Sequence, residues 1–269
     1  ALPGSEDEQQ FARRGFMQTE IWPFFLFALT GMLAFVAAND FLIMFVALEV
    51  MSLPLYLLAG MARRRRLLSQ EAALKYFILG AFSSAFFLYG AALLYGYSGS
   101  VGFVGIADVL AAKPAEGTMV AVGIALVMVG LLFKVAAVPF HQWTPDVYQG
   151  APTPVTAFMA ATVKIAAFGA LLRVLYVSVG GLRWDWTPML WIIAGLTMVV
   201  GSIVAITQTD MKRMLAWSSI AHAGYLMLGV LTFISPSAGG TEMMMRTREL
   251  GWAAGSAVLF YLIGYSLMN

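Results

Sequence analysis

Three ionisable residues, Glu49, Lys134 and Lys164, lie deep inside long apolar segments of this 269-residue chain. If each segment is a helix that rises ~1.5 Å per residue, Glu49 lies ~12 Å, Lys164 ~15 Å and Lys134 ~24 Å from its start. Within a hydrocarbon core ~30 Å thick, the first two are near the midplane and the third is nearer the inner face. A charge at such a depth costs ~2.5–3.5 kcal/mol, and residues of this kind typically mark transport paths.

Proton transfer is the chemistry that these residue types favour. Burial raises the pKa of a carboxylic acid and lowers that of an amine, and an opposite charge nearby reverses both shifts. A change in a neighbouring charge can therefore move a buried glutamate–lysine pair across neutral pH. A metal-cation site would need several clustered carboxylates or carbonyls, and Glu49 is the one carboxylate predicted at mid-membrane depth. The alternative is an inert ion pair, or a lysine whose amine reaches the interface.

Two prolines stand at the same distance from two of these charges. Pro54 follows Glu49 by five residues, and Pro139 follows Lys134 by five. A proline inside a helix removes one backbone hydrogen bond and frees a carbonyl. Interrupted helices are common at ion sites in transporters. The spacing therefore predicts helix breaks beside both buried charges, although two ordinary kinks would give the same pattern.

Lys75 and the two histidines are weaker candidates. Lys75 follows Glu71 by four residues, so position alone favours an ordinary surface pair on a helix. His141 lies at the inner end of the Lys134 segment, where its pKa suits proton exchange, although an interfacial histidine with satisfied hydrogen bonds is an equal alternative. His222 belongs to the polar stripe Ser-Ser-Ile-Ala-His-Ala-Gly-Tyr at 218–225. That stripe indicates either a hydrated path or hydrogen bonds between helices.

The elements that must position these residues are membrane helices. The chain is 61% hydrophobic and 11% charged, with a mean hydropathy of +0.82, whereas soluble domains carry about 25% charge. Its apolar runs are continuous and approach the ~20 residues that cross a bilayer, which predicts helices and excludes a strand-built barrel. The sequence therefore predicts an all-α, polytopic transmembrane bundle of about eight helices. They are expected at 21–38, 41–62, 72–97, 118–143, 154–179, 187–207, 213–234 and 252–268.

The remaining composition restricts the kind of protein further. No cysteine is present, which excludes thiolate-bound iron–sulfur clusters and cysteine zinc sites in this chain. The net charge of +2 comes from loop arginines, above all Arg63 to Arg66, and indicates a membrane orientation with the amino terminus inside, with no nucleic-acid partner. Residues 1–20 form a polar lead-in. Because the chain starts at Ala1 and stops at Asn269 after an apolar run, we expect it to be an internal piece of a longer protein.

Three stretches of sequence resemble a known family. Residues 133–155 read FKVAAVPFHQWTPDVYQGAPTPV, which resembles the signature of the antiporter-like membrane subunits of proton-pumping NADH:quinone oxidoreductase (respiratory complex I). The segment TPDVYQG is most similar to the N-type, ND2-like subunit. Residues 71–77, EAALKYF, and the stripe at 218–225 agree with it. The resemblance covers roughly residues 35–230.

The resemblance implies roles for individual residues. Glu49 resembles the glutamate that gates the first half-channel, and Lys75 resembles the lysine paired with it, which replaces the surface-pair interpretation. Lys134 resembles the central lysine on a broken helix. Lys164 resembles the lysine that passes protons toward the middle of the membrane, and His141 matches the histidine of the Pro-Phe-His motif.

The resemblance also implies a fold with two inverted five-helix repeats that contain broken helices. We then expect three parts: the lead-in 1–20, a complete first repeat at 21–179, and the first three helices of an incomplete second repeat at 187–269. The second broken helix, with its exit lysine, would fall after Asn269.

The function implied is proton translocation by a subunit of complex I without a redox centre of its own. No cofactor is expected in this chain, and NADH, FMN, iron–sulfur clusters and quinone belong to other subunits. The implied partners are other membrane subunits, including neighbouring antiporter-like ones, and the lipid bilayer. The implied location is an energy-transducing membrane, the bacterial plasma (inner) membrane. Two alternatives stay open: a subunit of a multisubunit cation/proton antiporter, and a structural membrane scaffold with inert ion pairs.

Overall fold

A computed structural model describes residues 6–13, 21–62, 66–112, 118–232 and 256–264 of the chain. All regular elements in these ranges are helical. They are α1 (Glu6–Arg13), α2 (Ile21–Ala37), α3 (Phe41–Ala59), α4 (Arg66–Ser98), α5 (Phe103–Ala112), α6 (Thr118–Val135), α7 (Trp143–Gly150), α8 (Thr153–Phe158), η1 (Met159–Val163), α9 (Lys164–Arg173), η2 (Val174–Ser178), η3 (Gly180–Leu182), α10 (Arg183–Ile206) and α11 (Met211–Thr232). Residues 256–264 form a further helix.

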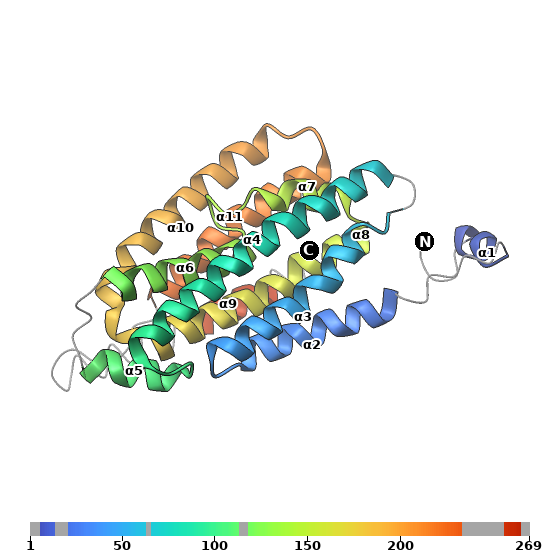
Figure 1. The fold of residues 1–269 in the computed structure, drawn as a ribbon. Coiled ribbons are helices and arrows are strands. Elements are labelled where there is room, and N and C mark those ends of the chain that lie inside the picture. The colour runs from blue at the N-terminus through green and yellow to red at the C-terminus, as the bar shows by residue number, and fades with distance from the viewer. Residues whose placement is uncertain (1–5, 14–20, 63–65, 113–117, 233–255, 265–269) are drawn as a thin grey trace.

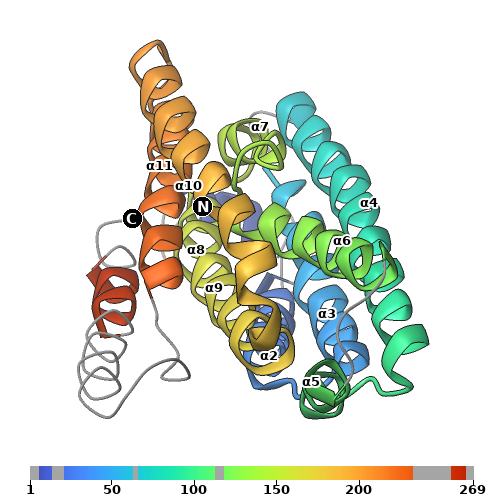
Figure 2. The same ribbon diagram turned by 90° about the vertical axis from the view of Figure 1, so that its left-hand side faces the viewer.

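The long helices lie side by side in an elongated bundle (Figure 1). Turned by 90°, the bundle has α10 and α11 on one side and α3, α4 and α6 on the other, with α8 and α9 between them (Figure 2). Six of the described helical stretches are long and apolar enough to cross a membrane, while α2, with 17 residues, is shorter. The chain is therefore a polytopic all-α membrane bundle, as the sequence predicts.

Glycines allow the closest approaches between helices. A Cβ added to Gly31 of α2 would lie 2.3 Å from the backbone nitrogen of Met51 on α3. A Cβ at Gly90 of α4 would lie 2.6 Å from the carbonyl oxygen of Gly123 on α6. Small residues at helix contacts let backbones pack closely in lipid, where no hydrophobic effect drives helices together. These contacts fix the α2–α3 and α4–α6 pairs, which carry Glu49 and Lys134.

The structure corrects the predictions for both helices in which a proline follows a buried charge. The predicted helix 118–143 ends already at Val135, and a separate short helix, α7, starts at Trp143. Conversely, α3 continues through Pro54, so the helix break expected there is absent. Pro54 is buried within α3 and removes one backbone donor. One missing bond bends or weakens a helix without ending it, because packing on both sides holds the remaining turns.

Some predictions fall on residues outside the described ranges. Residues 63–65 of the arginine run, most of the lead-in, and the two ends of the predicted helix 252–268 are among them. Within the lead-in, Glu6–Arg13 is helical. The helix at 256–264 lies inside the predicted last span.

Candidate functional site

Lys134 is the penultimate residue of α6, which ends at Val135. After Val135 the chain leaves the helix with Ala136, whose φ of 64° is in the left-handed region. The backbone N–H of Ala136 bonds to the carbonyl of Phe133 at 3.1 Å, and that of Val138 bonds to the hydroxyl of Thr197 on α10 at 3.0 Å. The break beside Lys134 is thus a hydrogen-bonded turn held by a neighbouring helix.

The left-handed conformation of Ala136 leads to a test of the turn. A residue other than glycine in this region carries strain of roughly 1–2 kcal/mol. Ala136→Gly is therefore expected to stabilise the protein by ~1 kcal/mol, because glycine adopts this conformation without a Cβ penalty. Ala136→Val is expected to destabilise it by roughly 2–4 kcal/mol, because a β-branched side chain is strained in the left-handed conformation and Ala136 is buried. Thermal unfolding of the purified protein measures both changes, and equal stability of the two variants would contradict the turn.

The ammonium of Lys134 lies in a pocket of polar and aromatic side chains from α3 and α4. The side chain is 1% exposed, and its Nζ donates a hydrogen bond to Ser52 Oγ at 2.7 Å. Ser52 in turn donates to the carbonyl of Leu48. The rings of Tyr56 and Tyr76 lie 5.7 and 5.5 Å from Nζ, within the range of cation–π attraction. This environment holds a buried lysine without a direct carboxylate contact.

Glu49 lies one turn before Ser52 on the same helix, and its charge acts on Lys134 and Tyr56. Its Oε1 is buried and has no hydrogen-bond partner among the described residues. An unpaired buried polar atom typically costs about 1–3 kcal/mol. Glu49 is therefore a partly buried carboxylate that acts on Lys134 through its charge, without a direct ion pair between the two side chains.

The expected pair of Glu49 with Lys75 is not formed, and the helix register explains why. The rings of Tyr56 on α3 and Phe77 on α4 are 5.7 Å apart. In this antiparallel pair, Glu49 is then level with Ser84, about 13 Å along the axis from Lys75. Helix side chains lean toward the amino terminus of their own helix, so those of Glu49 and Lys75 point away from one another.

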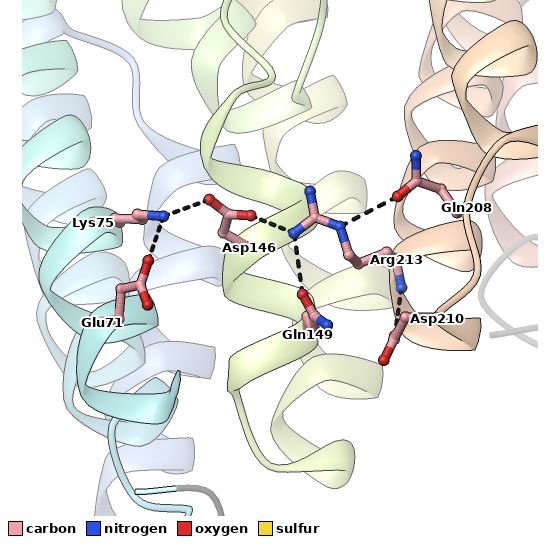
Figure 3. A network of polar contacts seen from close by, with 7 residues as sticks. All are labelled: Glu71, Lys75, Asp146, Gln149, Gln208, Asp210 and Arg213. Atoms are coloured by element: carbon pink, nitrogen blue, oxygen red, sulfur yellow. Dashed lines mark hydrogen bonds and ion pairs between the residues drawn. The ribbon is translucent and has the colours of Figure 1, made fainter. Parts of the chain in front are cut away.

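Lys75 instead belongs to a charged cluster at the end of the bundle where α4 begins (Figure 3). Its Nζ lies 2.6 Å from Glu71 Oε1 and 2.7 Å from Asp146 Oδ2. The other oxygen of Asp146 contacts Arg213 of α11 at 2.5 Å. The side chains of Lys75 and Glu71 are 42% and 55% exposed. The i,i+4 pair that position alone favours is thus present, extended by a partner on α7.

Asp146 lies outside the six helices that are long enough to span a membrane. Partial burial raises the pKa of its carboxyl, but the contacts with Lys75 and Arg213 outweigh burial and the net pKa is lowered. A carboxylate with a lowered pKa stabilises the folded state above its ordinary pKa, and this stabilisation is lost only as the pH falls through the lowered value. Asp146 is therefore a fixed negative charge at neutral pH.

Lys164 lies at the start of α9, directly after a π-helical stretch at Met159–Val163. It is 2% exposed, and its Nζ donates to both the carbonyl and the hydroxyl of Ser219 on α11, the latter at 2.5 Å. π-Helical turns occur frequently at functional sites, because the wider turn alters the direction of the side chains that follow. No sequence pattern predicts this irregularity.

His222 and His141 occupy different surroundings. His222 lies one turn after Ser219 on α11, and its Nδ1 shares a hydrogen bond with the Tyr261 hydroxyl of the helix 256–264. His141 lies between α6 and α7, where its ring packs on Trp217 at 5.0 Å. Burial lowers the pKa of His141, partly opposed by a hydrogen bond with the backbone of Pro139. Its neutral form therefore predominates at pH 7.

No cluster of His, Cys, Asp and Glu with the geometry of a metal site occurs within the described ranges. The polar residues gathered here are lysines, hydroxyls, single carboxylates and histidines. Such a set can hold and pass protons between side chains, whereas hard metal cations need several oxygen ligands.

Comparison with known proteins gives one consistent result. The family described as "NADH:quinone oxidoreductase/Mrp antiporter, TM" matches residues 38–269. The NADH-quinone oxidoreductase subunit N of a Nocardioides species is 62% identical over 265 residues, 98% of this chain and 48% of that protein. The chain thus spans about half the length of the curated relatives that it matches.

Two solved structures are similar in fold. One is respiratory complex I from Thermus thermophilus, with a TM-score of 0.67, 42% identity, and coverage of 91% of this chain and 52% of that chain. The other is the Mrp complex from a Dietzia species, with a TM-score of 0.75, 27% identity, and coverage of 91% and 42%.

Proposed function

We propose, from the premise that this chain belongs to the family of NADH:quinone oxidoreductase and Mrp antiporter membrane subunits, that it translocates protons as part of complex I. The observation that carries the proposal is Lys134, which is fully buried at a helix break, donates a hydrogen bond to Ser52 and is influenced by the charge of Glu49. Intramembrane ionisable residues in such positions form proton relays in pumps and transporters. The redox chemistry would take place in other subunits, which hold NADH, FMN, iron–sulfur clusters and quinone.

The proposed path runs through the centre of the bundle. Protons from the inner side pass His141 and reach Lys134, whose affinity for a proton depends on Glu49. Because α6 packs against α9, Lys134 can hand its proton on toward Lys164. From Lys164 the path continues to Ser219, which accepts its hydrogen bond, and then to His222, one turn further along α11 and within reach of the charge of Lys164. Lys75 does not belong to this proton path; it lies at the inner surface of the bundle and acts on the path from there.

Buried polar atoms without a partner among the described residues support a hydrated path. They include Glu49 Oε1, Tyr76 Oη and Ser84 Oγ, which all belong to α3 and α4. Buried polar groups in proteins are nearly always hydrogen-bonded, and ordered water supplies the bond where protein groups do not. Water between these atoms would connect Glu49 with the pocket of Lys134.

The outer surface of the bundle fits the proposed surroundings. Large apolar side chains such as Trp22 (65%), Phe82 (67%) and Ile203 (59%) are exposed on α2, α4 and α10. Faces of this kind suit lipid or other membrane subunits, including neighbouring antiporter-like ones. We further propose that the first repeat occupies 21–179, that the second begins at 187, and that the membrane is the bacterial plasma membrane.

Replacement of Lys134 tests the proposal. Lys134→Ala in the full-length protein, within the assembled complex, is expected to lower proton uptake per NADH oxidised by at least tenfold. A loss of this size is expected when one proton-transfer group is removed. Proton uptake by membrane vesicles, normalised to assembled complex, measures the effect. Full pumping by this variant would support the alternative of a structural scaffold with inert ion pairs.

A cation/proton antiporter is the second candidate, because the family covers both kinds of protein and the Mrp complex shares the fold. The higher identity to the complex I chain, 42% against 27%, favours the first candidate. Sodium separates the two experimentally. Transport that depends on sodium in vesicles with defined salts would favour the antiporter.

A further inference from the structure

Asp146 connects helices that are distant in the sequence (Figure 3). One carboxylate oxygen contacts Lys75 of α4 at 2.7 Å and the other contacts Arg213 of α11 at 2.5 Å. Arg213 also donates to Gln149 of α7 at 3.0 Å and to Gln208 at 3.3 Å. The carboxylate is thus held from both sides by cations on two long helices.

Asp146 belongs to α7, a helix of eight residues that follows the break after α6. Helices this short are not stable on their own, so tertiary contacts determine where α7 lies. Besides Asp146, the carbonyl of Ala151 at its end accepts a hydrogen bond from Lys212 of α11 at 2.8 Å. The position of α7 is therefore tied to α11 through two basic residues.

The other end of α7 touches the surroundings of Lys134. The indole N–H of Trp143, the first residue of α7, donates to the carbonyl of Phe133 at 2.9 Å. Phe133 directly precedes Lys134 in the last turn of α6. The Trp143 ring also stacks on Tyr76, with centroids 4.6 Å apart and planes 8° from parallel, and Tyr76 flanks the ammonium of Lys134.

We infer that Asp146 is a positioning residue for Lys134, acting through α7 and Trp143. This inference rests on the proposed function of Lys134 as a proton carrier. With Lys75 and Arg213, Asp146 fixes α7, and Trp143 then holds the turn and the tyrosine ring that place the ammonium of Lys134. Because Arg213 lies on α11, a shift of α11 would reach Lys134 by the same contacts. Asp146 itself remains ionised and carries no proton.

The test uses the full-length protein in the assembled complex, in inside-out membrane vesicles. Asp146→Asn and Trp143→Phe are each expected to lower proton uptake per NADH oxidised by about three- to tenfold, since small misplacements of a reacting group have effects of this size or larger. Asp146→Glu, which keeps the charge, is expected to restore most of the uptake. Glu71→Gln is the matched control, because Glu71 contacts the same lysine at 2.6 Å but lies on α4 and makes no ion pair with α7 among the described residues.

The double variant Asp146→Asn/Trp143→Phe separates positioning from general damage. If Asp146 acts through Trp143, both substitutions disturb the same contact. The double variant is then expected to pump no less than whichever single variant has the lower proton uptake. Multiplied losses, or a loss in Asp146→Asn no larger than in Glu71→Gln, would overturn the inference. Should Asp146→Asn fail to assemble, Trp143→Phe must still reduce uptake while Asp146→Glu keeps most of it, and any other result counts against the inference. Lys134→Ala, measured in parallel, tests the proposed function separately: if it abolishes uptake while Asp146→Asn pumps fully, only the positioning role fails.

Discussion

Glu49→Gln is expected to reduce proton uptake per NADH oxidised by at least tenfold while the complex still assembles. Glutamine keeps the shape of the side chain but removes the negative charge that acts on Lys134. Without that charge, the ammonium of Lys134 loses its one nearby counter-charge among the described residues. Each ~1.4 kcal/mol of lost interaction changes the protonation equilibrium about tenfold. Lys134 would then hold its proton too weakly to collect it from the inner side.

Two variants serve as controls for this prediction. Glu49→Asp retains the charge with a shorter side chain and is expected to keep much of the uptake. Glu71→Gln removes a carboxylate from the exposed cluster and is expected to have little effect, because exposed ion pairs contribute little. Proton uptake and quinone-dependent NADH oxidation, measured on the same vesicles, give the comparison. Equal pumping by the glutamine and aspartate variants would contradict a role for the charge of Glu49.

Most of the fold could be predicted from the sequence, because membrane helices have simple requirements. Apolar runs of sufficient length must be helical in lipid, and the starts of α2, α3 and α6 fall at the predicted residues. The positions of Glu49, Lys134 and Lys164 inside the bundle follow from the same runs. The residue at which α6 ends could not be placed, because its turn depends on Ala136 and on a hydrogen bond that the backbone N–H of Val138 donates to Thr197, 59 residues away in sequence.

The partner of Lys75 could not be predicted correctly from the family resemblance. Pairing with Glu49 requires a helix register that no local pattern specifies, and the side chains point in opposite directions. Local spacing did indicate Glu71, four residues before Lys75. Asp146 and Arg213 were missed because their contacts join segments 67 to 71 residues apart in sequence. The sequence feature that could have pointed to Asp146 and Arg213 is that both lie at the ends of apolar segments.

Lys134→Arg is expected to lower proton uptake almost as strongly as Lys134→Ala. Arginine keeps the positive charge, so it can still interact with Glu49 and the two tyrosine rings. Its guanidinium is effectively never deprotonated in proteins, and therefore it cannot pass a proton on. The planar group is also larger than an ammonium and fits the space beside Ser52 poorly. A structural ion pair predicts the reverse, because the charge is preserved.

Proton uptake by inside-out vesicles that contain the Lys134→Arg variant, normalised to assembled complex and to NADH oxidised, therefore tests the central claim most directly. Wild-type vesicles and Lys134→Ala vesicles give the upper and lower limits. We predict uptake close to that of the alanine variant, with assembly retained. Uptake equal to that of the wild type would show that Lys134 is only a fixed charge, and would contradict a proton path through this residue.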